Sequence, residues 1–215
     1  MKYKETAEKL AEYRSQIAEI REKMRIAQAS IEPEEVQDYE FAAPQGKARL
    51  STLFGDKDTL FVVHNMGTTC AHCTMWADGF NGVFEHLRDR AAFVVSSPDM
   101  PERQQSFAAG RGWKFPMVSN QGTTFAEDMG YRPNGRAMPG VSVLKRKGDK
   151  IMRVADTAFK PGDDFCGVWH LFDLIPEGAA GWQPEFSYAS LSRTVGGNDR
   201  AGSLLPASHP AAFAL

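Results

Sequence analysis

The chain has 215 residues, with 25 Lys and Arg against 27 Asp and Glu, and 42% of its residues are hydrophobic. A globular chain of this size can bury a core without a metal or a disulfide. The near balance of charge argues against non-specific nucleic-acid binding, which needs an excess of cations. No apolar run approaches the roughly 18 to 20 residues that span a bilayer, and the charged start MKYKETAEKL lacks the apolar core of a signal peptide. We therefore expect a cytoplasmic protein with no membrane or nucleic-acid partner, whose thiols are kept mostly reduced.

Residues 1–32 predict an N-terminal amphipathic helix that Pro33 ends. Its apolar and small residues alternate at spacings of three and four, which is the a/d seam of a coiled coil. The seam consists of Tyr3, Thr6, Leu10, Tyr13, Ile17, Ile20, Met24 and Ala27. Two interpretations are open: the helix packs on its own domain, or it makes a homodimer.

Residues 33–177 predict one α/β domain with a mixed central sheet flanked by helices. Buried strands are expected at 59–66 and 91–96 with a helix over 74–88 between them. A further helix runs to about Arg111 after a cap at Asp99. Strands that alternate with helices in this way pair in parallel through right-handed crossovers.

After a loop of about twenty residues, strands at 140–144 and 150–154 predict an antiparallel hairpin with its turn at 147–149. A last helix is expected over about 164–174. Residues 178–215 form an irregular C-terminal extension, which we expect Trp182, Phe186 and Tyr188 to hold against the domain.

Two of the three cysteines occur in the sequence Cys70-Ala71-His72-Cys73, directly after the first buried strand and at the start of the next helix. A helix N-terminus favours a thiolate over a thiol, so Cys70 is the expected nucleophile. Cys73, one turn further on, can resolve a mixed disulfide. His72 either adds positive or hydrogen-bonding character beside Cys70 or is a solvated residue without effect.

A metal site is the competing interpretation of this pair. A closed zinc site normally takes four ligands, and the remaining histidines and Cys166 show none of the usual spacings. We expect no metal and no cofactor. Cys166 is expected to be a small core residue with a free thiol.

A strand, a CxxC at a helix start, a further βα unit and a hairpin entered through Met138-Pro139 together resemble the thioredoxin fold. More narrowly, residues 10–177 are similar to a thioredoxin-like family known only as domain of unknown function 899. The motifs that carry this resemblance are Tyr39-Glu40-Phe41, Gly46, Leu50-Ser51-Thr52-Leu53-Phe54-Gly55, His64-Asn65-Met66, Cys70 to Cys73, Trp76-Ala77-Asp78, Phe80, Gly112-Trp113-Lys114-Phe115-Pro116, Ser119 and Asp173-Leu174-Ile175-Pro176.

The resemblance implies roles for residues outside the CxxC. It implies a cis peptide bond between Met138 and Pro139 that faces the dithiol, and we assign substrate binding to Met138, Pro139 and Trp76. His64 stands six residues before Cys70, where thioredoxins have a buried acid, so it is a candidate acceptor for the Cys73 proton. The alternative is that His64 is a core histidine.

These residues predict a thiol-disulfide oxidoreductase that acts on protein or small-molecule disulfides. A non-catalytic thioredoxin-like module for dimerisation or partner binding is the alternative. A thiol peroxidase is favoured less, because Gly67 stands where peroxiredoxins have a threonine, three residues before the reactive cysteine.

Overall fold

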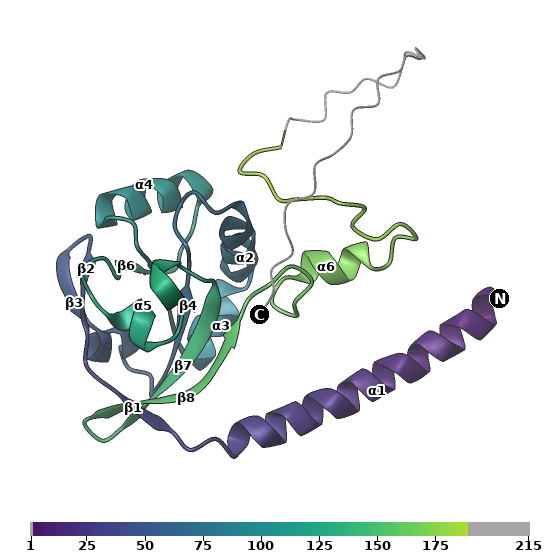
Figure 1. Ribbon diagram of the computed structural model, residues 1–215, viewed down its shortest axis with the longest axis horizontal. Helices are drawn as coiled ribbons and strands as arrows, with labels where there is room; N and C mark the ends of the chain where they lie inside the picture. Colours follow the sequence, from purple (N-terminus) through teal and green to yellow (C-terminus); the bar gives the residue numbers. More distant parts are fainter. Residues whose placement is uncertain (1, 189–215) are drawn as a thin grey trace, which may run out of the picture.

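The computed structural model describes residues 2–188, and the predictions made for 189–215 lie outside this part of the chain. Eight strands form one sheet in the order β1-β8-β7-β4-β5-β6-β2-β3 (Figure 1). Their bounds are β1 Glu34–Val36, β2 Glu40–Ala43, β3 Gly46–Arg49, β4 Thr59–His64, β5 Ala92–Ser97, β6 Met117–Ser119, β7 Gly140–Lys147 and β8 Lys150–Ala158.

The centre of the sheet confirms the predicted topology. β4 and β5 pair in parallel, and so do β5 and β6. β7 and β8 form the expected antiparallel hairpin, and Gly148 in its turn has a φ of 65°, a conformation that glycine adopts without strain. Both outer pairs are antiparallel additions that the sequence did not predict, with β1 on β8 and the β2–β3 hairpin on β6.

The helices are α1 Tyr3–Ala29, α2 Ala71–Gly82, α3 Phe84–Arg90, α4 Pro101–Arg111, α5 Phe125–Asp128 and α6 Gly167–Phe172, with short 3-10 helices at Leu50–Phe54 and Pro133–Gly135. The single helix expected over 74–88 is two helices that meet at Val83, whose φ of −114° and ψ of 12° are not helical. Gly79 and Gly82 lower the helix propensity just before this break.

The two faces of the sheet bury separate cores. Leu60 and Val62 of β4 pack in the first core with Phe125 of α5. Val63 packs in the second with Trp76 of α2 and Trp169 of α6. Because successive side chains of a strand point to opposite faces, His64 belongs with Leu60 and Val62, on the face away from α2.

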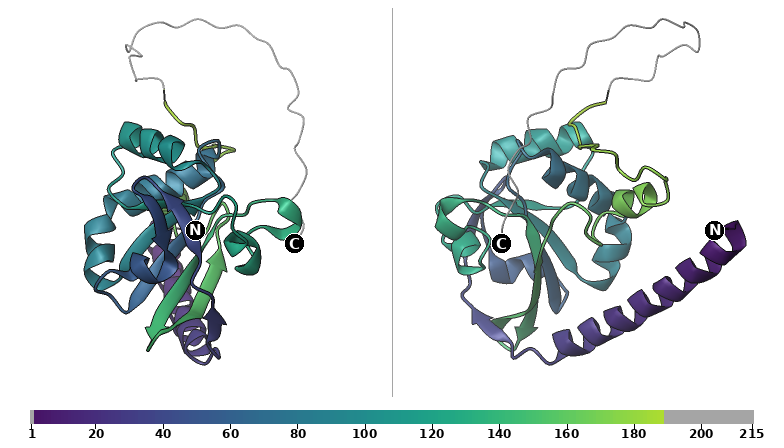
Figure 2. Two further views of the ribbon diagram at one scale, coloured as in Figure 1. Left: turned by 90° about the vertical axis from the view of Figure 1, so that its left-hand side faces the viewer. Right: turned by 45° about the vertical axis from the view of Figure 1, so that its right-hand side comes forward.

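Helix α1 extends away from the sheet (Figures 1 and 2). None of its residues is buried. It contacts the domain through Arg21, which lies 2.8 Å from an Asp164 carboxylate oxygen, and through Gln28 Nε2, which donates to Val154 O at 3.0 Å. The helix is present as predicted, and its apolar seam is exposed. Within residues 2–188, no helix is both long and apolar enough to cross a membrane.

The described part of the C-terminal extension packs on the second face. The Trp182 ring lies 5.0 Å from the Phe172 ring, and Tyr188 stacks on Trp182 at 6.4 Å. Phe186 lies 6.3 Å from Phe107 of α4. These are the three aromatic residues that were expected to hold the segment.

Candidate active site at the start of helix α2

Cys70 and Cys73 form a disulfide, with Cα atoms 5.3 Å apart. Cys70 is the N-cap residue of α2, in extended conformation, and its Sγ accepts the Cys73 backbone N–H at 3.0 Å. The Thr74 hydroxyl donates to the Cys70 carbonyl, also at 3.0 Å. A sulfur atom at this position takes the place of a capping oxygen. The free N–H groups of the first helical turn therefore favour negative charge on Cys70 when the disulfide opens.

The loop between β4 and Cys70 is held by Asp99, which lies just before α4, and by Arg103 of α4. Thr68 donates its backbone N–H to Asp99 Oδ2 at 2.7 Å, and Arg103 Nε donates to the Thr68 hydroxyl at 2.6 Å. Arg103 also lies 3.5 Å from the Asp99 carboxylate. Asp99 thus fixes the loop instead of capping α4, whose N-cap residue is Met100. The capping role expected for Asp99 was wrong, because the helix begins two residues after it.

Gly67 allows this loop to approach Asp99 closely. Its φ of 108° lies in the left-handed region that side chains other than glycine rarely adopt. A Cβ at Gly67 would lie 2.8 Å from Asp99 Oδ2. The Gly67 N–H donates to Asn65 Oδ1 at 2.8 Å, which closes the turn. Thr68, Asp99 and Arg103 were not among the predicted site residues, because no sequence spacing connects this loop to α4.

His72 packs against helix α6. Its ring stacks on Trp169 of α6 at 6.4 Å, and its Nε2 is buried without a hydrogen-bond partner. Burial lowers the pKa of His72 below its usual value of 6.5. A neutral imidazole at pH 7 supplies no positive charge to Cys70. Of the two effects predicted for His72, positive charge and hydrogen bonding, the first is therefore disfavoured.

His64 lies on the opposite face of the sheet from α2. Its ring stacks on Tyr131 at 3.9 Å, and its Nε2 shares a hydrogen bond of 2.9 Å with Ser142 Oγ. Full burial, with a smaller contribution from the charge of Arg153, lowers its pKa to about 3. These contacts favour the alternative that His64 is a buried structural histidine over the predicted role as proton acceptor for Cys73.

The predicted cis bond between Met138 and Pro139 is wrong, since no peptide bond within residues 2–188 is cis. Pro139 continues the extended pairing of β7 and β8, because its carbonyl accepts the Phe159 N–H at 2.9 Å. Next to it, the Tyr131 ring packs over Gly140, where a Cβ would lie 2.1 Å from ring carbon Cε1.

Trp76 and Met138 differ in their access to substrate. Trp76 is 2% exposed and donates its Nε1–H to Asp163 Oδ1 at 3.2 Å, so it lies beneath the site and cannot form a surface for substrate. Met138 is 39% exposed. It lines a cavity of about 60 Å³ together with His64, Asn65 and Tyr131.

Cys166 has a free thiol that is buried. Burial raises its pKa above the usual value, with a smaller contribution in the same direction from the charge of Asp163. A buried thiol of raised pKa is a poor nucleophile. This agrees with the expectation that Cys166 is a core residue.

The mixed sheet and the CxxC disulfide at a helix start define this chain as a thioredoxin-fold protein. A family model described as a bacterial protein of unknown function, DUF899, matches residues 3–191. The chain therefore belongs to this family, which confirms the resemblance drawn from its motifs. Among curated proteins, none matches it.

Several solved structures share the fold. Peroxidoxin BcpB from Mycobacterium tuberculosis is 24% identical with a TM-score of 0.48, over 57% of this chain and 84% of that one. Peroxiredoxin Q from Xanthomonas campestris is 17% identical with a TM-score of 0.50, over 61% and 87%. A yeast mitochondrial 1-Cys peroxiredoxin is 13% identical with a TM-score of 0.50, over 59% and 66%. At these identities, the likeness concerns the fold.

Proposed function

We propose that this protein is a thiol-disulfide oxidoreductase with the Cys70–Cys73 pair as its redox centre. The observation that carries the proposal is the position of Cys70 at the N-cap of α2, where its sulfur accepts the Cys73 N–H. That position stabilises a thiolate at the residue that must attack, and it puts the second sulfur within bonding distance.

The reaction exchanges two electrons between the dithiol and a substrate disulfide. The Cys70 thiolate attacks one substrate sulfur, which forms a mixed disulfide and releases the other substrate sulfur as a thiolate. Cys73 then loses its proton and attacks Cys70 Sγ, which forms the intramolecular disulfide and breaks the bond between Cys70 and the substrate. The substrate sulfur held in the mixed disulfide leaves with the electron pair of that bond and takes up the proton from Cys73. The substrate is reduced, the protein is oxidised, and a dithiol reductant restores the starting state.

The substrate class is a protein or small-molecule disulfide, and the proposed setting is the cytosol. Exposed loop residues Thr69 and Met138, on two different loops, are available for contact with a substrate chain. Trp76 is left out of this surface because it is buried.

Insulin reduction with dithiothreitol as the reductant tests the proposal. Cys70→Ser should abolish the reaction, whereas Cys73→Ser should accumulate a mixed disulfide that mass spectrometry detects. Cys166→Ser is the matched control and should keep the wild-type rate, because its thiol is buried and unpaired.

Peroxide consumption by the same variants separates the alternatives. Wild-type protein that consumes peroxide faster than it reduces insulin would favour a thiol peroxidase. Wild-type protein inactive in both assays would favour the non-catalytic binding module.

A further inference from the structure

The charges of helix α1 are sorted by their position around its apolar seam. With Tyr3 at position a of the heptad, the five glutamates all lie at positions c and f, on the side away from the seam. The positions that border the seam, e and g, carry only cations and neutral residues. These are Lys2, Ala7, Lys9, Arg14, Gln16, Arg21, Lys23 and Gln28.

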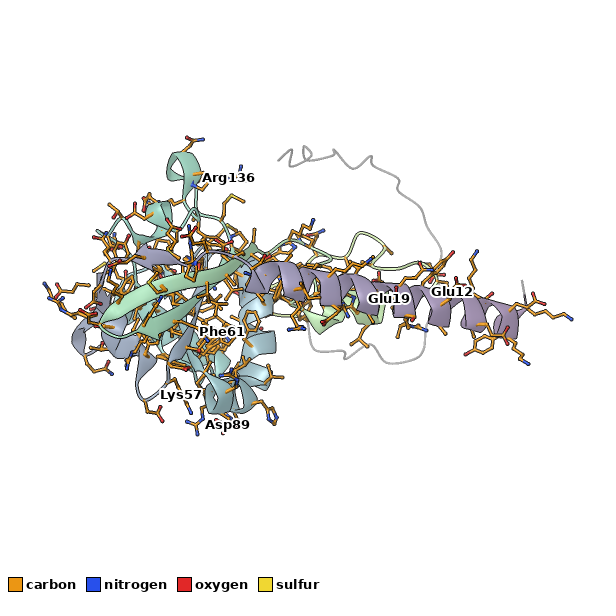
Figure 3. All side chains as sticks on the ribbon, turned by 90° about the horizontal axis from the view of Figure 1, so that it is seen from below. Glu12, Glu19, Lys57, Phe61, Asp89 and Arg136 are labelled. Carbon is orange, nitrogen blue, oxygen red and sulfur yellow. A yellow bond between two sulfur atoms is a disulfide. The ribbon has the colours of Figure 1, made fainter. Side chains whose placement is uncertain are left out.

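This seam is accessible along the helix. The exposed fraction of its large apolar residues from Leu10 to Met24 lies between 44% for Tyr13 and 64% for Met24. Glu12 and Glu19 lie where α1 extends beyond the domain (Figure 3). An apolar stripe of this length in water fits a surface that another molecule covers.

The charges beside the seam disfavour pairing of α1 with the α1 helix of a second copy of this chain. In a parallel pair, position g of one helix faces position e of the other, so Lys9 would face Arg14 of a second copy. In an antiparallel pair, e faces e and g faces g, which again places cation opposite cation. Like charges at these positions destabilise a coiled coil.

The apolar seam of α1 also matches a lipid surface less well than it matches a partner helix. Helices that lie in a membrane interface have a wide apolar face opposite a strongly charged one, with the apolar side chains sunk between the lipid headgroups. Apart from Ile26 at position c, which is 57% exposed, the large apolar residues of α1 lie in the a/d stripe, and this stripe has the width that one partner helix covers. The residues after 188 do not complement the cations either, since they carry Arg193 and Arg200 but only Asp199.

Within this chain, one of the cations beside the α1 seam already forms an ion pair with the domain. Arg21, at position e, lies 2.8 Å from the Asp164 carboxylate. Gln28, also at position e, contacts the Val154 carbonyl of β8. In the C-terminal half of α1, the e positions therefore face the domain. In the described part of the chain, Lys9, Arg14 and Lys23 do not contact the domain in this way, and their charges are available to a partner.

We propose that α1 binds an amphipathic helix of another protein, with Glu or Asp on both sides of its own apolar seam, as a two-stranded coiled coil. The pairing buries the α1 seam and places carboxylates opposite Lys9, Arg14 and Lys23. The interaction does not depend on the chemistry of Cys70 and Cys73.

Two labelled peptides of about four heptads, added to the full chain, test this proposal. Both have Leu at every a and d position, and they differ only in having Glu or Lys at every e and g position. The Glu peptide should bind with a dissociation constant at least about tenfold lower, measured by fluorescence anisotropy. Raising NaCl from about 50 to about 500 mM should weaken its binding.

Charge reversal beside the seam should invert this preference. The triple variant Lys9→Glu, Arg14→Glu and Lys23→Glu should prefer the Lys peptide. The matched control reverses three charges at position c, with Glu5→Lys, Glu12→Lys and Glu19→Lys, and it should still prefer the Glu peptide. Insulin reduction and circular dichroism show that both variants are folded.

Three results would overturn the proposal. The first is equal affinity of the wild-type chain for the two peptides. The second is a wild-type dimer in sedimentation at the concentrations used for binding, which would assign the seam to a second copy. The third is binding to phosphatidylserine vesicles without binding to the Glu peptide.

Discussion

At the level of single residues, two charged side chains fix the loop that precedes Cys70: Asp99, just before α4, and Arg103, within it. The Asp99 carboxylate accepts the Thr68 N–H, and Arg103 donates to the Thr68 hydroxyl and forms an ion pair with Asp99. The Asp99 side chain is 15% exposed, so water competes weakly for these bonds. Hydrogen bonds to a charged group in such a place stabilise more than neutral ones. The geometry of the nucleophile therefore depends on a residue that does not react.

We predict that Asp99→Asn destabilises the protein and slows disulfide exchange. The substitution removes the charge that pairs with Arg103 and weakens the bond to Thr68, so the free energy of unfolding should fall by about 1 to 3 kcal/mol. Urea denaturation and insulin reduction measure the two effects. Asp89→Asn, at an exposed position of α3 that Figure 3 labels, is the control and should change stability by less than about 0.5 kcal/mol. Equal results for the two variants would contradict the role of Asp99.

His64 predicts a pH dependence of stability. Its pKa in the folded protein is about 3, below the value of 6.5 of an unperturbed histidine, so the unfolded chain binds the proton first as the pH falls. The stabilisation is fully present above about pH 6.5 and is lost toward pH 3. From pH 7 to pH 4, the wild type should lose about 3 kcal/mol more than His64→Gln, which does not titrate.

Urea denaturation at both pH values measures this difference. The exposed His86→Gln is the control for the loss of an imidazole. If the difference in the free energy of unfolding between wild type and His64→Gln is the same at both pH values, His64 is not buried in its neutral form. Alkylation of the reduced dithiol between about pH 6 and 9 should be the same in His64→Gln and wild type.

At the level of elements, the glycines of the β4–α2 unit have opposite roles. Gly67 has a positive φ and lies against Asp99, whereas Gly79 is in the middle of α2 with no atom within 4 Å of an added Cβ. Gly67→Ala should therefore destabilise by about 1 to 3 kcal/mol and slow exchange. Gly79→Ala should stabilise by about 0.5 to 1 kcal/mol. Thermal unfolding compares the pair, and a Gly67→Ala variant as stable as the wild type would contradict the close approach to Asp99.

The elements that could be predicted from the sequence are those that local patterns define. The buried runs of β4 and β5 and the Lys147-Gly148-Asp149 turn each lie within a few neighbouring residues. The strands β1, β2 and β3 are only three to four residues long, and their place at the sheet edges depends on distant partners. The break at Val83 was missed because the apolar spacing of the helical pattern continues across it.

At the level of the whole molecule, the sheet separates two histidines that the sequence placed near one dithiol. The CxxC could be recognised because its residues are adjacent in the chain. The role of His64 was assigned by counting six residues back from Cys70, but alternation along β4 turns that side chain toward Phe125 and Tyr131. The face of a sheet on which a side chain lies depends on packing, which a count along the chain does not measure.

The C-terminal segment packs on α6, and Trp169 of α6 packs in turn on His72 of the dithiol helix. The Trp182 ring lies 5.9 Å from Trp169, and Trp169 stacks in turn on His72. Burial is the cause that lowers the pKa of His72. Loosening α6 should therefore admit water to His72 and raise its pKa toward the usual value of 6.5.

Trp182→Ala tests this connection between the extension and the site. The loss of its contacts with Trp169 and Phe172 should lower the free energy of unfolding by about 1 to 3 kcal/mol. The pKa of His72, followed by NMR titration of its ring protons, should rise. Phe186→Ala is the control, since Phe186 is in the same segment but packs on Phe107 of α4, and it should leave that pKa unchanged. An unchanged pKa in Trp182→Ala would mean that Trp169 keeps its place without Trp182, and that the described end of the extension does not affect the dithiol site.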